Sequence, residues 1–247
     1  MINETLYKRF EEETISKVNR FRINKQDLKD LKKSFKNKIV LISGAAGSIG
    51  SQFSKDIFKY NFKIKKIIFL DKDENMLTEL NRELLLFRNF KKIKREFVCS
   101  DLNSINISNL LMKDKVQFYL NFAAIKHVRS EENIQSIKYM FKTNSVNFVP
   151  KKLNNLKKIF SISTDKTVNP SSILGVSKYL MEMNLSKYKN KNIFVSSVRF
   201  ANVAFSNGSI LKYVVDRLIQ KRKFGVPENI KRYFITHSEA SNLCFKS

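Results

Sequence analysis

The sequence predicts an α/β protein in which a parallel β-sheet is covered by helices on both faces. From residue 38 onward, short apolar segments of strand length alternate with longer segments of helical periodicity. The first predicted strand runs directly into a glycine-rich turn, and no internal repeat or low-complexity linker interrupts the alternation. These observations together indicate one doubly wound α/β domain.

The six expected strands are short runs rich in β-branched and aromatic residues, at 38–43, 63–70, 95–100, 116–123, 157–163 and 192–200. The segments between them have apolar residues at helical spacing, and we expect helices near 48–60, 74–88, 131–148, 174–189 and 209–222. Strands that alternate with helices form βαβ units, so all six strands are expected to be parallel.

Residues 1–36 precede this pattern and are polar and charged. Their apolar residues have the spacing of amphipathic helices with a break near residues 22–25, and they are Leu6, Phe10, Ile15, Val18, Leu28 and Leu31. We expect an N-terminal helical arm of one or two helices that packs on the following domain or on a partner subunit. The chain is therefore divided into an arm, 1–36, and an α/β domain, 37–247.

The chain is strongly basic, with 47 Lys and Arg against 22 Asp and Glu and a net charge of +25. Such a charge allows polyanion binding. The basic residues are spread along the whole chain, however, and no aromatic–basic RNA-binding motif occurs among them. We therefore expect no specific nucleic-acid partner, although a basic surface would attract an anionic nucleotide substrate.

Cys99 and Cys244 lie in apolar runs and predict buried free thiols in a reducing compartment. No apolar run reaches the ~18 residues of a membrane span, and the N-terminal residues have no apolar core of a signal peptide. We expect a cytoplasmic protein without a membrane span. His127 and His237 have no metal-ligand spacing with the cysteines, so no metal site is predicted.

The segment GAAGSIG (44–50) lies between the first strand and the first helix of the α/β pattern. Its glycines permit a tight turn, close approach of a phosphate and close packing of helix on strand. The helix N-terminus offers free amides and a positive dipole end to that phosphate. We predict that this turn binds the pyrophosphate of a dinucleotide through Gly44, Gly47, Ser48, Ile49 and Gly50.

Acidic residues follow the next two strands. Asp71 ends the second strand, and a carboxylate there binds the ribose hydroxyls of adenosine and repels a 2′-phosphate, which favours NAD. Lys72 beside it would soften that repulsion, so NADP stays open. Asp101, after the third strand, is placed to meet the adenine. The expected fold is therefore Rossmann-like, with NAD or NADP as cofactor.

Several motifs resemble known families. The glycine spacing GxxGxxG and the segment NFAAIKHV (121–128) resemble the extended short-chain dehydrogenase/reductases, in which small residues such as Ala123 and Ala124 lie against the cofactor. SISTDKTVNPSSILGVSK (161–178) is more specific, and it resembles the CapD/FlaA-like nucleotide-sugar dehydratases of polysaccharide biosynthesis. The resemblance extends over about residues 38–245 through LDKDEN, KTNSVN, VRFANVAFSNGS and RYFITHSEA.

This resemblance implies an NAD(P)-dependent 4,6-dehydratase, a lyase, acting on a UDP-linked N-acetylhexosamine such as UDP-N-acetylglucosamine in surface polysaccharide biosynthesis. In the family, hydride leaves C4, water is eliminated across C5 and C6, and hydride returns to C6. Thr164, Asp165 and Lys166 end the fifth strand. By position Asp165 would protonate the leaving hydroxyl, Lys166 would take the C5 proton, and Lys178 would hold the nicotinamide ribose.

The resemblance also implies substrate-binding residues. Arg199 and Asn202 would lie near the UDP moiety with the segment that ends at Ser209. The forked guanidinium of Arg232 suits a diphosphate, and Lys126 would contribute a further cation. A homo-oligomer is expected by analogy with the family alone.

Departures from the family pattern support an alternative function. Leu174 stands where the superfamily has a tyrosine, as methionine does in one branch of the family, and Ala46 and Ala201 replace glycines. The chain ends before a segment that completes the substrate lid in the family, so we expect an incomplete substrate side and weak turnover. The alternative is a non-catalytic dinucleotide-binding homologue that acts as a sensor or assembly partner. An epimerase is disfavoured by the STDK motif and the missing tyrosine.

Overall fold

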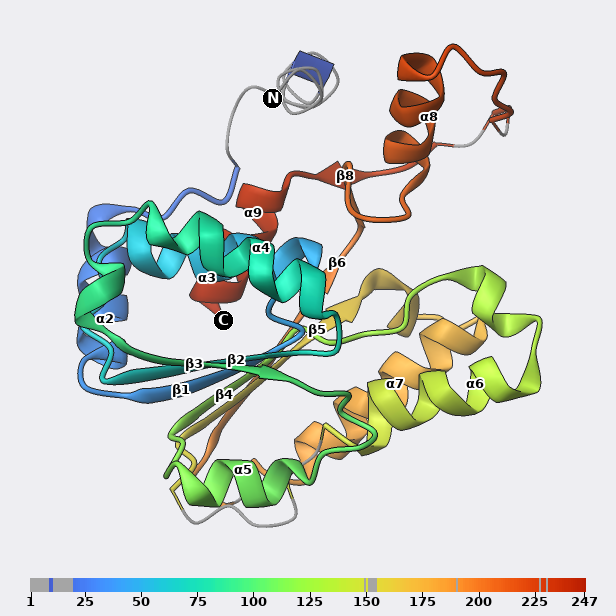
Figure 1. The fold of residues 1–247 in the computed structure, drawn as a ribbon. Coiled ribbons are helices and arrows are strands. Elements are labelled where there is room, and N and C mark those ends of the chain that lie inside the picture. Colours follow the sequence, from blue (N-terminus) through green and yellow to red (C-terminus); the bar gives the residue numbers. More distant parts are fainter. Residues whose placement is uncertain are drawn as a thin grey trace.

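The computed structural model describes residues 9–10, 20–148, 150, 155–189, 191–226, 228–229 and 231–247. Its main sheet has six parallel strands in the order β3-β2-β1-β4-β5-β6 (Figure 1), and their bounds are β1 Ile39–Ser43, β2 Lys66–Asp71, β3 Lys94–Cys99, β4 Phe118–Asn121, β5 Lys158–Thr164 and β6 Phe194–Phe200. This is the strand order of the Rossmann fold. The predicted doubly wound α/β fold is therefore confirmed.

The strand order reverses between β1 and β4. Ser43, the last residue of β1, pairs with Leu70 of β2 on one side and with Asn121 of β4 on the other. In open α/β sheets, ligands bind in the crevice at the carboxyl ends of the strands, where the order reverses. The fold thus places the glycine turn after β1 at the position where a ligand is expected.

Helices cover both faces of the sheet (Figure 1). One face carries α2 Lys25–Phe35, α3 Ser48–Lys59, α4 Glu74–Leu85 and α9 His237–Lys246, and the other carries α5 Ile107–Lys113, α6 Ile134–Phe141 and α7 Ile173–Ser186. A smaller unit lies beyond the carboxyl ends of the strands, and it comprises β7 Asn202–Val203, α8 Ile210–Ile219 and β8 Phe234–Ile235, with β7 and β8 paired in parallel.

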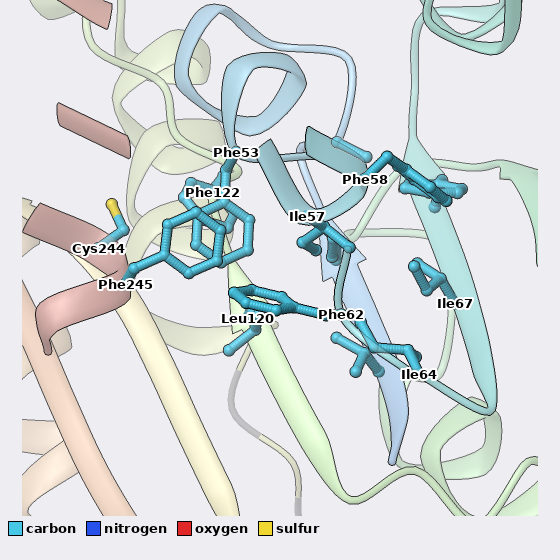
Figure 2. Close-up of a cluster of buried hydrophobic side chains, with 14 of the residues drawn as sticks. Phe53, Ile57, Phe58, Phe62, Ile64, Ile67, Leu120, Phe122, Cys244 and Phe245 are labelled. Carbon is cyan, nitrogen blue, oxygen red and sulfur yellow. The ribbon is translucent and has the colours of Figure 1, made fainter. Parts of the chain in front are cut away.

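Aromatic and aliphatic side chains together form the core on the α3 side of the sheet (Figure 2). The ring of Phe245 in α9 stacks on Phe53 in α3 with 4.0 Å between ring centroids. Phe35 at the end of α2 stacks on Phe62 at 4.9 Å. In the described part of the predicted arm, α2 packs on the core of the following domain through Phe35. The division at residue 36 stays a prediction, and residues 1–8 and 11–19 lie outside the described residues.

A second core lies between the sheet and the α5–α7 side, and its buried members include Leu41, Tyr119, Ile159, Met181 and Leu185. These residues come from strands β1, β4 and β5 and from α7. Because both faces of the central strands are buried, their sequences are continuous apolar runs rather than alternating ones.

The single helix expected over 131–148 is divided in the structure. A 3₁₀-turn, η2 Val128–Glu131, precedes α6, and a π-helical turn, η3 Lys142–Val146, follows it. Within the π-turn, the side chain of Asn144 accepts a hydrogen bond from the amide of Ile125 and donates one to its carbonyl, both at 2.9 Å. These bonds connect the turn to the segment that follows β4.

Both cysteines are free thiols, as predicted; the predicted burial is confirmed for Cys244 and wrong for Cys99, which is exposed. Cys99 is the last residue of β3, which is an edge strand, and one side of an edge strand has no neighbouring strand to cover it. Within the described residues, no helix is long and apolar enough to cross a membrane, and no group of three metal-ligating side chains occurs.

Candidate active site

A cleft of about 960 Å³ opens at the carboxyl ends of β1, β4, β5 and β6. Its walls are the glycine turn with the start of α3, the segment after β4, the end of β5 with α7, and the β7–α8–β8 unit. Among the described residues, those that line it include four Lys or Arg side chains and no carboxylate, which suits an anionic ligand. A second cavity, of about 900 Å³, lies at the opposite edge of the sheet and includes none of the predicted site residues.

The glycine turn has no room for side chains at two positions. Gly44 has a φ of +67°, and a Cβ there would overlap the backbone at Phe122 and Ala123. A Cβ at Gly50 would overlap the carbonyl of Gly44, because helix and turn are in direct contact there. The N-cap of α3, Gly47, makes no side-chain hydrogen bond to the helix amides. The helix start is therefore open to an anion, as a pyrophosphate requires.

Asp71 lies directly beside this turn. Its carboxylate accepts hydrogen bonds from the amide of Ala46 at 2.9 Å and from the amide of Asp73 at 3.2 Å. The alanine that replaces a family glycine at position 46 therefore keeps a backbone role that fixes the carboxylate. A fixed carboxylate at the end of β2 suits the ribose hydroxyls of a dinucleotide.

Asp101 lies beyond the end of the neighbouring strand β3. Its carboxylate accepts hydrogen bonds from the hydroxyl of Tyr139 in α6 and from the amide of Asn103. Burial opposes ionisation of Asp101, but these hydrogen bonds and the charge of Lys72 outweigh it and lower the pKa of the carboxyl. Asp101 is thus an ionised group held by Tyr139, a partner that sequence analysis did not identify.

Lys178 projects from α7 and is almost completely buried, with 4% of its surface exposed. Its ammonium group donates to the carbonyl of Ile162 in β5 at 3.0 Å and lines the cleft. Burial lowers the pKa of Lys178 to about 7, against the opposing charge of Glu182. At neutral pH this amine can both hold and accept a proton.

The STDK motif turns away from β5 into the short 3₁₀-turn η4 Asp165–Thr167. Thr164 donates its hydroxyl hydrogen bond to Asp165 at 2.9 Å, and Lys166 lies 3.7 Å from the same carboxylate. Thr164 and Lys166 line the cleft with Lys178, whereas the half-exposed Asp165 lies outside its lining. Thr164 at the end of β5, Lys166 in η4 and Lys178 in α7 thus converge on the cleft.

Leu174 lies one helical turn before Lys178 and also lines the cleft. The amides of Ile173 and Leu174 donate to the carboxylate of Glu131 at 3.2 and 3.0 Å, so Glu131 neutralises the first amides of α7. Sequence analysis missed Glu131, because this contact joins residues from separate elements. It fixes the start of the helix that bears Lys178.

Four of the five predicted substrate residues line the cleft, namely Lys126, Asn202, Ser209 and Arg232. Lys126 donates to the hydroxyl of Ser206 at 3.3 Å, and burial lowers the pKa of its amine. The loop before α8 also touches the glycine turn, because the amide of Asn207 donates to the hydroxyl of Ser48 at 3.0 Å. Segments that carry predicted cofactor residues and predicted substrate residues therefore line one cleft.

Arg199 does not lie where the sequence led us to expect it. It pairs in register with Ser163 of β5, and paired residues of parallel strands point to the same face of the sheet. That face carries Glu182 of α7, which binds the guanidinium of Arg199 through two hydrogen bonds. Arg199 is therefore held outside the cleft lining, on the α7 side of the sheet.

The two histidines lie close to lysines. Burial and the charge of Lys126 lower the pKa of His127, whose ring packs against Gly208. Burial, with the charges of Lys126 and Lys55, lowers the pKa of His237 to about 4. Both imidazoles are therefore neutral at neutral pH.

The sheet order, the glycine turn and the cleft at its reversal point define a Rossmann-like protein. The sequence profile of the family described as polysaccharide biosynthesis protein matches residues 40–247, and the chain belongs to this family. The predicted relationship to CapD/FlaA-like extended short-chain dehydrogenase/reductases is thereby confirmed.

Two curated relatives and one solved structure illustrate the similarity. The capsular polysaccharide biosynthesis protein CapD of Staphylococcus aureus is 31% identical over 90% of this chain and 37% of its own length. The UDP-N-acetylglucosamine 4,6-dehydratase (inverting) of Campylobacter jejuni is 29% identical over 76% of this chain and 56% of its own. The chain therefore spans about a third to a half of these relatives.

The solved structure is UDP-glucuronic acid 4-epimerase from Bacillus cereus in complex with UDP-glucuronic acid and NAD. It is 19% identical, superposes with a TM-score of 0.68, and covers 82% of this chain and 70% of its own. At this identity the similarity concerns the fold.

Proposed function

We propose that this chain carries the cofactor site and the catalytic lysines of an NAD(P)-dependent nucleotide-sugar 4,6-dehydratase. The observation that carries the proposal is the convergence of Lys166 and the buried Lys178 in one cleft with the open N-terminus of α3. A dehydratase needs groups that move protons beside a bound nicotinamide, and this cleft combines both requirements.

The glycine turn, part of which lines the cleft, fits a dinucleotide on three points of its geometry. Side chains at Gly44 and Gly50 would fill the turn, α3 lacks a side-chain cap, and Asp71 is fixed beside both. Gly47, Ser48 and Ile49 would hold the pyrophosphate, and Asp71 the adenosine ribose. A bound nicotinamide supplies reversible hydride transfer.

Lys178 would position the nicotinamide ribose from the floor of the cleft. Because Leu174 stands where the superfamily has a tyrosine, the C4 hydroxyl of the sugar needs another proton acceptor. Burial gives the amine of Lys178 a pKa near 7, and this amine lies on the same face of α7 one turn from Leu174. We assign it as the acceptor of that proton.

Asp165 and Lys166 would perform the elimination. After oxidation at C4, the proton on C5 is acidic, and Lys166 in the cleft lining would take it as a general base. Asp165, 3.7 Å from Lys166, would deliver a proton to the hydroxyl that leaves C6. Since Asp165 is exposed and outside the lining, substrate binding must bring it against the sugar.

The substrate side supports an anionic sugar nucleotide. Lys126 and Arg232 line the cleft on the side of the β7–α8–β8 unit, and no carboxylate lies among the described lining residues. Two cations there would bind the diphosphate of a UDP-linked N-acetylhexosamine. The relative from Campylobacter jejuni, whose name specifies UDP-N-acetylglucosamine, makes this sugar nucleotide the first substrate to test.

One observation favours the second candidate, a non-catalytic dinucleotide-binding homologue. Asp165, the proposed acid, lies outside the cleft lining, and Leu174 has no proton to exchange. Cofactor binding without turnover would follow if the cleft never closed on a sugar.

The purified protein should be incubated with UDP-N-acetylglucosamine and NAD or NADP. The sugar nucleotides should then be separated and their masses measured by mass spectrometry. We expect loss of one water from the sugar nucleotide, with Asp165→Asn and Lys166→Ala at least about 100-fold slower. Lys189→Ala, a lysine beyond the end of α7, is the matched control and should be unaffected. No product alongside tight dinucleotide binding would leave the non-catalytic homologue as the function.

A further inference from the structure

Three side chains meet beside the carboxyl ends of β2 and β3. The hydroxyl of Tyr139 donates to the carboxylate of Asp101. The ammonium group of Lys72 donates to the same hydroxyl at 3.4 Å and lies 5.2 Å from the centre of the tyrosine ring. We name these three residues the Lys72 clamp. Its members come from three separate segments, the β2–α4 connection, the segment after β3, and α6.

The clamp lies next to the proposed adenosine site. Asp71, the residue before Lys72, has its backbone carbonyl bonded to the amide of Ser100 and is paired with Cys99 across the strands. Asp101 follows directly. The carboxylate of Asp71 itself is turned toward the glycine turn, where it accepts from the backbone amides of Ala46 and Asp73. Asp71 and Lys72 thus point to different partners.

The different partners of Asp71 and Lys72 matter for the binding of a 2′-phosphate, the one group that distinguishes NADP from NAD. Such a phosphate carries nearly two negative charges at neutral pH and requires a cation or a fork of donors. Asp71 repels it. Lys72 is the neighbouring cation, but its charge already faces the π-cloud of Tyr139 and the ionised Asp101 behind it.

We propose that the Lys72 clamp makes this protein selective for NAD, because Tyr139 and Asp101 hold the ammonium group of Lys72 away from the position of a 2′-phosphate. Tyr139 is then a specificity-determining residue that acts through Lys72. The inference rests on the proposed function only in that a dinucleotide must bind.

Equilibrium titration with NADH and with NADPH, followed by nicotinamide fluorescence, gives the ratio of their dissociation constants without any turnover. The wild-type protein should bind NADH at least about tenfold more tightly than NADPH. Tyr139→Phe keeps the ring and removes the hydroxyl, and should narrow the ratio about twofold to fourfold. Tyr139→Leu removes both contacts and should narrow it about tenfold.

A double variant shows whether the narrowed ratio of dissociation constants in Tyr139→Leu comes from the release of Lys72 or from general disruption of the binding site. Lys72→Ala alone should leave NADH affinity within about twofold, because the clamped lysine does not touch NAD. Lys72→Ala added to Tyr139→Leu should restore the wild-type ratio. Tyr179→Leu, an exposed tyrosine on α7, is the matched control and should change neither affinity.

Three outcomes would overturn the inference. A ratio that does not respond to Tyr139→Phe and Tyr139→Leu would show that the clamp has no part in selection. A loss of NADPH affinity in Lys72→Ala alone would show that Lys72 already reaches the 2′-phosphate. In both cases NADH binding would leave the proposed function intact. Binding of neither dinucleotide would overturn the inference and the proposed function together.

Discussion

Glu182 of α7 binds the guanidinium of Arg199 through two hydrogen bonds, at 2.9 Å to Nε and 2.6 Å to Nη2. The same carboxylate accepts a hydrogen bond at 2.6 Å from the hydroxyl of Ser163, which is buried at the end of β5. Glu182 therefore connects α7, which bears Lys178, to β5 and β6, two of the strands whose ends border the cleft.

We expect Glu182→Ala to lower the free energy of unfolding by about 2 kcal/mol, because it leaves the buried Ser163 hydroxyl without its acceptor. The half-exposed guanidinium of Arg199 should contribute little. Urea denaturation measures the change. Glu79→Ala on α4 breaks an exposed ion pair with Arg82 and is the matched control, with an expected loss below about 0.5 kcal/mol. Equal losses in both variants would contradict the connecting role of Glu182.

Gly44→Ala should destabilise the protein by at least about 2 kcal/mol. The positive φ disfavours any side chain, and the new methyl would overlap the backbone after β4. Thermal unfolding and dinucleotide titration should both be affected. Gly225→Ala is the control, because a Cβ there has no neighbour within 4 Å, and it should leave both measurements unchanged. A Gly44→Ala protein as stable as wild type would show that the turn can rearrange.

Lys178→Met should stabilise the protein near pH 7 while weakening dinucleotide binding. The folded-state pKa of about 7 lies below the ordinary 10.5, so the unfolded chain binds more protons between these values and wild-type stability rises with pH across this window. The methionine variant lacks this dependence. Its advantage should be largest near pH 7 and disappear toward pH 10.5. Denaturation at several pH values checks this, and a constant difference would argue against a buried, neutral amine.

Acid should destabilise the wild-type protein through His237. Its folded-state pKa of about 4 lies below the ordinary 6.5, so its contribution to stability is present above pH 6.5 and is lost as pH falls toward 4. His237→Gln should flatten stability against pH in this window. Lys55→Met should flatten it partly, since the charge of Lys55 helps to lower the pKa of His237. If the slope of stability against pH were unchanged in both variants, groups other than His237 would cause the acid sensitivity.

Leu174→Tyr tests whether the missing tyrosine limits turnover. If the Lys178 amine accepts the C4 proton, the new hydroxyl is not needed, and its bulk in the cleft should leave product formation unchanged or lower. A rise of about tenfold or more would show that wild type lacks a proton acceptor. Leu180→Tyr, at a partly exposed position on the same helix, is the control for the added tyrosine.

Local signals predicted most of the fold. The six strands were expected because each is a short β-branched run between helical segments, and the glycine turn located the ligand-binding edge. The helix Ile107–Lys113 was missed because it is only seven residues long and has little periodicity, although Asn106 caps its N-terminus. Cys99 was misjudged because sequence does not show which strand lies at a sheet edge.

Sequence analysis predicted many of the residues that line the site, but not the side chains that bind and position them. The turn glycines, Asp71 and Lys178 could be predicted because each belongs to a short sequence motif at a strand end or on one helical turn. Glu131, which binds the first amides of α7, and Tyr139, which binds Asp101, are distant in sequence from their partners and lie in no motif that sequence analysis singled out. Strand register and helix packing bring these groups together, and the register of β6 with β5 places Arg199 beside Glu182, outside the cleft lining.

The position of β1 in the middle of the sheet has a consequence for synthesis on the ribosome. β2, in which Lys66 pairs with Ile39, is synthesised soon after β1. β4, in which Phe118 pairs with Val40, is synthesised much later, so one edge of β1 stays unpaired until then. Until then the growing chain exposes an apolar strand edge, which invites pairing with other chains. A nascent chain that pauses before β4 is therefore expected to expose the β4-facing edge of β1 to pairing with other chains.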